Sequence, residues 1–166
     1  GVEKVVDAMG GVKVNVPFHM KYRDVYDKPP LIIDIPAGER TLSGKEAIKF
    51  LRFRKTNMRG GQGYPQGDIG RIQTHQAFLK AAVDKAIGPK LPKVMKTFIE
   101  NVDSDLSLRI GIKLATKAIK LDNANVKTYL LPGIPPTKSP WYWTPDQPKI
   151  QEMLKEIYAS ETKEKK

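Results

Sequence analysis

The chain has 166 residues, enough for one domain with a substantial buried core. It contains no cysteine, which excludes disulfide bonds, cysteine-ligated metal sites and cysteine nucleophiles. Its 29 Lys and Arg residues outnumber 18 Asp and Glu residues, and the resulting net charge of +11 favours polyanionic partners such as nucleic acid, anionic lipid or phosphate-bearing polymers. No apolar run approaches the roughly 20 residues that cross a bilayer. Because the chain begins with glycine rather than methionine, we expect a segment of a longer product.

The first part of the chain predicts one helix and two strands. Residues 2–8 place three valines on one helical face, and the two glycines that follow are typical of a helix end. Residues 12–16 alternate valine with polar residues, the pattern of a half-buried strand. Residues 31–35 predict a second strand, preceded by a polar, irregular connection over 19–30 and followed by a turn over 36–38.

The middle of the chain predicts two helices joined by a loop. Ser43 is expected to cap a helix that begins at Gly44. Residues 55–67 contain four glycines and no apolar periodicity, as expected for a flexible loop beside a binding site. Residues 68–87 predict a long helix, ended by Gly88 and Pro89. The predicted apolar stripe of this helix consists of Ile69, Ile72, Leu79, Val83 and Ala86.

The remainder predicts helices over 92–101 and 105–120, a strand over 126–131, an irregular proline-rich segment and a last helix capped by Thr144 that runs to Tyr158. The expected buried residues are Ile110, Leu114, Ala118 and Leu121 in the second of these helices, and Ile150, Met153, Leu154 and Ile157 in the last. Helices and strands thus alternate in one α/β domain over residues 1–160. Residues 161–166 read as a disordered, charged tail.

Arginine side chains mark a candidate anion site in the middle of the chain. Arg52 and Arg54 are two residues apart, so both reach one ligand only if the helix ends near Arg52. Arg71 follows Asp68 by one helical turn, and Asp68 is either an N-cap or a first-turn acid that orients Arg71. Guanidinium groups bind phosphate oxygens two at a time, and a helix N-terminus adds backbone donors. The alternative for Arg52 and Arg54 is a solvated basic helix end.

Three motifs resemble one protein family, in order and with matching spacing. They are GGVKVNVP at 10–17, PAGERTLSGKEAIKFLRFR at 36–54 and GDIGRIQTHQAFLKA at 67–81. This series resembles the LytR-CpsA-Psr family of bacterial cell-wall glycopolymer transferases over residues 1–87, and more loosely to Tyr158. The resemblance implies an α-β-α sandwich with a mixed central sheet, here without the N-terminal half of the domain.

The same resemblance implies a function. The family transfers an anionic glycopolymer, of teichoic acid or capsule type, from a polyprenyl-pyrophosphate carrier to peptidoglycan. Arg52, Arg54 and Arg71 would be the catalytic residues that bind the pyrophosphate, with Asp68, His75 and Gln76 as further substrate-binding residues. The implied cofactor is Mg²⁺, with ligands outside this segment, since we predict no metal site within it. The isoprenoid would need an apolar groove, for which the candidates are Val14, Ile33, Phe50 and Leu79.

The implied setting is the extracellular face of the bacterial membrane or the cell wall, with a membrane anchor in the missing N-terminal part. A second chain that supplies the N-terminal half is a further implied partner, because this segment by itself could bind without catalysing. Thr74 and His75 depart from the Arg-Gln-Gln usual in the family: Thr74 removes a positive charge, and His75 replaces a glutamine but can still donate one hydrogen bond.

An alternative function of a different class is a non-catalytic polyanion-binding or wall-associated module. The charge of +11 supports it. The basic residues are dispersed and form no recognisable nucleic-acid motif, so we expect no nucleic-acid partner.

Overall fold

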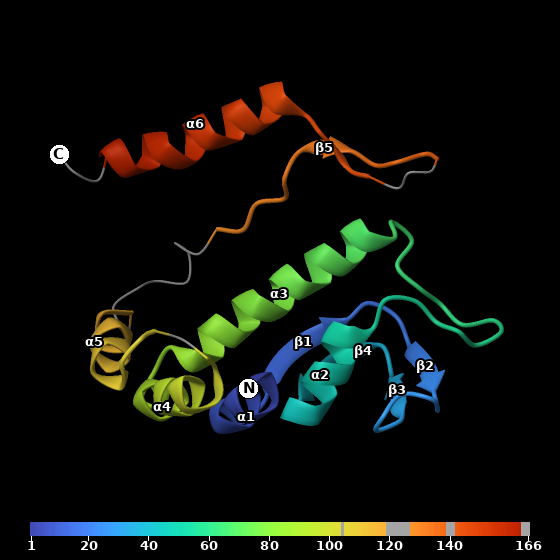
Figure 1. Ribbon diagram of the computed structural model, residues 1–166, viewed down its shortest axis with the longest axis horizontal. Helices are drawn as coiled ribbons and strands as arrows, with labels where there is room; N and C mark the ends of the chain where they lie inside the picture. The colour runs from blue at the N-terminus through green and yellow to red at the C-terminus, as the bar shows by residue number, and fades with distance from the viewer. Residues whose placement is uncertain (104, 119–126, 139–141, 164–166) are drawn as a thin grey trace. The chain divides into compact units, whose positions relative to one another are not determined.

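The computed structural model describes residues 1–103, 105–118, 127–138 and 142–163 (Figure 1). Its contacts divide the chain into two compact units, residues 1–126 and 127–166, each of which is described by itself. The elements of the first unit are α1 (Val2–Met9), β1 (Val12–Val16), β2 (Met20–Asp24), β3 (Leu31–Ile35), β4 (Gly38–Leu42), α2 (Gly44–Arg52), α3 (Asp68–Ala86), α4 (Leu91–Asn101) and α5 (Leu108–Ala118). Those of the second are β5 (Gly133–Ile134), β6 (Thr144–Pro145) and α6 (Gln147–Lys163).

The strands form three antiparallel pairs, and no parallel pairing occurs among the described residues. Strand β1 pairs with β4 from Val12 opposite Leu42 to Val16 opposite Gly38. Strand β2 pairs with β3, and the short β5 pairs with β6. The alternation predicted for residues 12–16 is confirmed, since their three valines are buried and the polar residues between them are exposed.

Two strands of the first unit were not predicted from the sequence. Strand β2 lies in the connection expected to be irregular, and β4 begins at Gly38, the last residue of the expected turn. Both have polar sequences, MKYRD and GERTL, in which hydrophobic alternation is weak. Their backbone groups nevertheless pair with the more apolar β3 and β1, so the neighbouring strand rather than local pattern makes them strands.

The core of the first unit gathers side chains from its four strands, from α1, α2, α3 and α4 and from the connections between them. Helix α3 packs on β1, α2 packs on β3 and α1, and α4 packs between α1 and α5 (Figure 1). The most deeply buried large side chains are Val6, Val12, Val16, Met20, Leu42, Phe50 and Phe53. Helix α2 is thus held from several sides just before its end at Arg52.

The predicted cap of α2 is confirmed. Ser43 Oγ accepts a hydrogen bond from the Glu46 amide (3.4 Å), and Glu46 Oε2 accepts one from the Ser43 amide (2.9 Å), which completes a capping box. Asp7 Oδ1 accepts a hydrogen bond from the Gly44 amide (2.7 Å) and so ties α1 to the start of α2.

The predicted buried faces of α3 and α5 are partly wrong. In α3 Phe78 is buried, whereas Leu79 is 59% exposed. In α5 Ile110 and Leu114 are about half exposed, at 52% and 51%; Leu121 lies outside the described residues. Apolar residues occur on more than one side of these helices, so periodicity alone does not select the side that a neighbouring element covers.

The second unit differs from its prediction in its strands and its cap. Residues 127–131 form no strand, and Val126 lies outside the described residues. The proline-rich segment instead contributes β5 and β6. Asp146 rather than Thr144 caps α6, because its Oδ1 accepts a hydrogen bond from the Lys149 amide (3.2 Å) while Thr144 lies in β6.

Helix α6 itself follows its predicted pattern. The four residues expected to face inward, Ile150, Met153, Leu154 and Ile157, are all half-buried. The helix continues to Lys163, so the first half of the expected tail is helical, and residues 164–166 lie outside the described part of the chain.

Candidate functional site

The end of α2 brings Arg52 and Arg54 into one pocket. Arg52 is the last residue of the helix, and Phe53 is already extended, with φ −65° and ψ 126°. Because the helix ends at Arg52, the side chains of Arg52 and Arg54 can both reach one ligand, as their spacing in the sequence required. The two arginines line a small cavity of about 240 Å³ together with Tyr22, Leu31 and Lys55.

A carboxylate holds Arg52 at this position. Arg52 Nη2 lies 2.7 Å from Asp27 Oδ2, and both side chains remain partly exposed. The hydrogen bond from Arg52 lowers the pKa of the Asp27 carboxyl. Sequence reasoning assigned no role to Asp27, and no local signal could have done so, because its partner is 25 residues away. An anion that binds Arg52 competes with this ion pair.

The start of α3 presents a second set of polar groups. Gly67 precedes the helix at φ 58° and ψ −127°, a conformation that a side chain would strain. Asp68 is the first helical residue and makes no capping bond within the described structure. Its Oδ1 lies 2.8 Å from Arg71 Nη2, so it is the first-turn acid that orients Arg71 rather than the N-cap.

His75 joins α3 to the end of α2. Its Nε2 lies 3.1 Å from the backbone oxygen of Leu51. Because a carbonyl only accepts, Nε2 carries the proton. Burial lowers the pKa of His75, which favours the neutral imidazole. The single N–H of that ring is thus used within the fold, and the ring cannot donate to a ligand as the sequence suggested unless it is protonated. Gln76 lies half-buried on the same helix.

The predicted site residues therefore fall into two groups. Arg52 and Arg54 share the pocket at the end of α2, while Asp68 pairs with Arg71 on the first turn of α3. Arg71 does not line that pocket. The link between the two groups is the contact of His75 with Leu51, the residue before Arg52.

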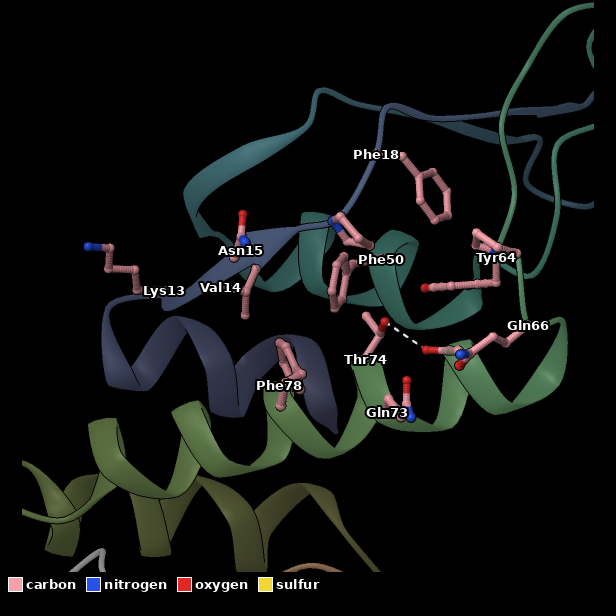
Figure 2. Close-up of a pocket in the computed structure, with 14 residues that line it drawn as sticks. Lys13, Val14, Asn15, Phe18, Phe50, Tyr64, Gln66, Gln73, Thr74 and Phe78 are labelled. Carbon is pink, nitrogen blue, oxygen red and sulfur yellow. Dashed lines mark hydrogen bonds between the residues drawn. The ribbon is translucent and has the colours of Figure 1, made fainter. Parts of the chain in front are cut away.

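An apolar pocket of about 580 Å³ lies between β1, α2, the segment before α3 and α3 itself (Figure 2). Its walls include Val14, Phe18, Phe50, Tyr64, Thr74 and Phe78. Two of the four predicted groove residues, Val14 and Phe50, line it. Of the others, Ile33 is buried in the core and Leu79 is exposed.

The comparison with known families is decisive here, because residues 1–159 match the model of the LytR_cpsA_psr family. The chain belongs to this family. Its α/β fold is that of LytR-CpsA-Psr proteins: the crystal structure of TagV from Bacillus subtilis is 25% identical, with a TM-score of 0.67 over 93% of this chain and 59% of that one. The structure of TagT bound to LIIa-WTA is 27% identical, with a TM-score of 0.67 over 94% of this chain and 56% of that one.

Several curated relatives in the family are named as transferases. The polyisoprenyl-teichoic acid–peptidoglycan teichoic acid transferase TagV of Bacillus subtilis (strain 168) is 25% identical over 164 residues, which cover 95% of this chain and 40% of that protein. TagU of the same strain, with the same activity in its name, is 27% identical over 166 residues, covering 94% of this chain and 47% of that protein. The chain thus spans less than half the length of these two LytR-CpsA-Psr relatives.

The described residues offer no ready-made magnesium site. They contain no cluster of three or more His, Cys, Asp or Glu residues that could hold a metal ion. The two carboxylates that contact the candidate arginines, Asp27 and Asp68, are each engaged by a guanidinium. Nor is any helix in the described part of the chain long and apolar enough to span a bilayer.

Proposed function

We propose that this chain forms the pyrophosphate-binding part of a transferase that moves a polyprenyl-pyrophosphate-linked anionic glycopolymer, of teichoic acid or capsule type, to peptidoglycan. Membership of a family in which several curated relatives are named teichoic acid transferases supports this. The observation that carries it is the shared pocket of Arg52 and Arg54 at the end of α2. Arg71, one turn into α3, completes the proposed arginine cluster.

The proposed reaction is a phosphoryl transfer. A sugar hydroxyl of peptidoglycan attacks the phosphorus that bears the glycopolymer; a new P–O bond forms, the P–O bond to the second phosphate breaks, and polyprenyl phosphate leaves. Negative charge must be neutralised as the hydroxyl approaches, and it accumulates on the leaving phosphate. Arg52, Arg54 and Arg71 would stabilise that charge. They stay protonated and so cannot accept the hydroxyl proton, which requires a separate base.

The apolar pocket is the proposed site for the first part of the isoprenoid chain. Its volume of about 580 Å³ and its lining by Val14, Phe50 and Phe78 suit a hydrocarbon. Five residues of α3 line the pocket, which lies above this helix in Figure 2: Gly70, Gln73, Thr74, Ala77 and Phe78. Arg71 lies on the first turn of the same helix. A lipid diphosphate that lies along α3 would place its tail in the pocket and its phosphates near the guanidinium groups.

The remaining parts of the proposal concern the whole protein. Magnesium belongs to it with ligands outside residues 1–166, since the carboxylates beside the arginines are already paired, and no step above depends on the ion. The proposed setting is the extracellular face of a bacterial membrane or the cell wall, with a segment beyond this chain, or a second chain, supplying an anchor and the other half of the site.

Calorimetric binding of a short polyprenyl diphosphate, with and without magnesium, tests the proposal. We expect saturable binding to the wild-type chain at moderate salt. The Arg52→Ala/Arg71→Ala variant should lose it without unfolding, whereas the control Arg109→Ala/Lys113→Ala, which removes two exposed charges from α5, should keep it. Absence of binding to a well-folded wild-type chain would refute the assignment of a pyrophosphate site to this segment.

The charge of +11 supports a second candidate, a non-catalytic polyanion-binding or wall-associated module. Such binding is dominated by charge and weakens steeply as salt rises. The affinity for a soluble polyphosphate, measured at low and high salt, distinguishes this module from the proposed lipid-pyrophosphate site. If the polyphosphate binds as tightly as the lipid diphosphate, and both lose affinity equally with salt, the module is the better description.

A further inference from the structure

Tyr64 is locked in place beside the first turn of α3. Its side chain is only 9% exposed, and its ring makes edge contacts with Phe18 (centroids 5.1 Å apart) and Phe53 (6.0 Å). Gly70 allows the ring to approach the helix, because a Cβ at that position would lie 3.1 Å from Tyr64 Cβ. Packing therefore fixes where the hydroxyl points.

The hydroxyl of Tyr64 is buried without a hydrogen-bond partner among the described residues, and so is Nε of Arg71. Thr74 lies beside the phenol, but its own hydroxyl donates to the Gly70 oxygen (2.9 Å) and it does not meet hydrogen-bond geometry with Tyr64 (Figure 2). Native proteins rarely leave buried donors unpaired, because each retains most of its desolvation cost. Two such donors in one place require an explanation.

The two unpaired donors lie near each other. Gly70, against which the Tyr64 ring packs, is the residue directly before Arg71. Burial raises the pKa of Tyr64, while the Thr74 hydroxyl and the positive charge of Arg71 act in the opposite direction. Tyr64, Gly70 and Thr74 all line the apolar pocket, and Figure 2 shows the hydroxyl end of Tyr64 directed toward Thr74 and Phe50. The pocket thus has an apolar body and one end where the Tyr64 hydroxyl lacks an acceptor. A phosphate oxygen only accepts hydrogen bonds, so it complements this end.

We propose that Tyr64 donates a hydrogen bond from its hydroxyl to a phosphate oxygen of the lipid ligand, with Arg71 Nε as the second donor, and thereby selects a phosphorylated lipid over an uncharged one. The inference rests on the proposed function and adds Tyr64 as a substrate-contacting residue that motif reasoning did not identify. A buried water molecule is the competing acceptor.

The test compares wild type with Tyr64→Phe and with a matched control, Tyr26→Phe, which removes a hydroxyl from a side chain that is 91% exposed. The probes are geranylgeranyl diphosphate and geranylgeraniol, which share the hydrocarbon and differ in the phosphates. We expect Tyr64→Phe to bind the diphosphate about tenfold more weakly, as is usual for the loss of one hydrogen bond to a charged group, and to bind the alcohol as wild type does. Tyr26→Phe should match wild type with both probes.

The midpoint of thermal unfolding without ligand provides the second readout. Phenylalanine removes an unpaired buried donor, so the melting temperature of Tyr64→Phe should equal or exceed that of wild type. A melting temperature several degrees lower would mean that a water or a protein group already accepts the hydrogen bond, and would overturn the inference.

The binding outcomes separate this inference from the function on which it rests. Unchanged diphosphate affinity in Tyr64→Phe, or an equal loss for diphosphate and alcohol, overturns the role of Tyr64 and leaves the arginine site standing. Failure of the wild-type chain to bind the diphosphate overturns both.

Discussion

The two helices that carry the candidate site begin in different ways. Helix α2 starts in a capping box between Ser43 and Glu46 and is tied to α1 through Asp7. Helix α3 starts after Gly67, with no side-chain cap among the described residues, and its first turns carry Arg71 and face Tyr64, both with unpaired buried donors. The contrast teaches that hydrogen bonding is satisfied at the start of α2, which lies away from the arginine pocket at the other end of that helix. It is incomplete where we propose that the lipid phosphates bind.

The largest expected effect concerns the packing of these two helices. Phe50 of α2 is 1% exposed, so Phe50→Ala should lower the free energy of unfolding by about 3–5 kcal/mol through lost burial and a new cavity. Leu79→Ala, on the uncovered side of α3, should change it by less than about 0.5 kcal/mol. Urea unfolding of both variants measures the difference. Equal losses would mean that Leu79 is covered, contrary to the structure.

The second prediction compares the arginines of the two helices in ligand binding. Arg71 is less exposed than Arg52, and its Nε has no partner within the described residues, whereas Arg52 already pairs with Asp27. We therefore expect Arg71→Ala to weaken binding of a polyprenyl diphosphate by about 2–3 kcal/mol and Arg52→Ala by about 1 kcal/mol.

Asp27→Asn provides the matched control for this comparison. It frees Arg52 from its ion pair and should increase the affinity for the diphosphate at low salt, with a smaller gain at high salt. Calorimetry gives all three constants. A greater loss from Arg52→Ala than from Arg71→Ala would reverse the contrast between the helices.

The third prediction concerns the cap itself. Ser43→Ala removes the hydroxyl from the capping box and should destabilise the chain by about 1 kcal/mol in chemical denaturation. Thr97→Ala, in the interior of α4 with a hydroxyl that donates to the Lys93 oxygen, should change stability by less than half as much. If the two losses were equal, the capping box would contribute nothing beyond an ordinary surface hydroxyl.

The smallest effect is a pH dependence at the link between the helices. Burial lowers the pKa of His75 below its ordinary value of 6.5. Above that pH the imidazole is neutral in the folded and unfolded states; as the pH falls below 6.5, the unfolded chain takes up the proton first, so stability decreases until the pH passes the folded pKa. His75→Gln keeps an N–H for Leu51 and should flatten this slope. Denaturant unfolding between pH 5 and 8 measures how the free energy of unfolding changes with pH. If this dependence were the same in His75→Gln, another titratable group would be its cause.

Much of the candidate site could be read from the chain because its signals are local. Ser43 followed by Glu46 predicts the cap of α2, and the spacing of Asp68 and Arg71 predicts their ion pair. The sequence alone showed that α2 must end near Arg52 if both arginines are to bind one ligand. The extended backbone at Phe53 in the structure shows that the helix does end there. The contact of His75 with Leu51 could not be foreseen, since it joins residues 24 positions apart.

The sequence by itself determined the family, the helices and the two strands β1 and β3, because three motifs in register and hydrophobic periodicity are properties of neighbouring residues. Only the tertiary structure decided that the polar β2 and β4 are strands, that Phe78 rather than Leu79 is buried, and that Asp27 holds Arg52. It also decided that the unpaired hydroxyl of Tyr64 lies at an apolar pocket, and that Tyr64 packs against the turn of α3 that carries the unpaired Nε of Arg71. These features depend on which distant segments cover one another, and the periodicity of a single segment carries no information about its partner.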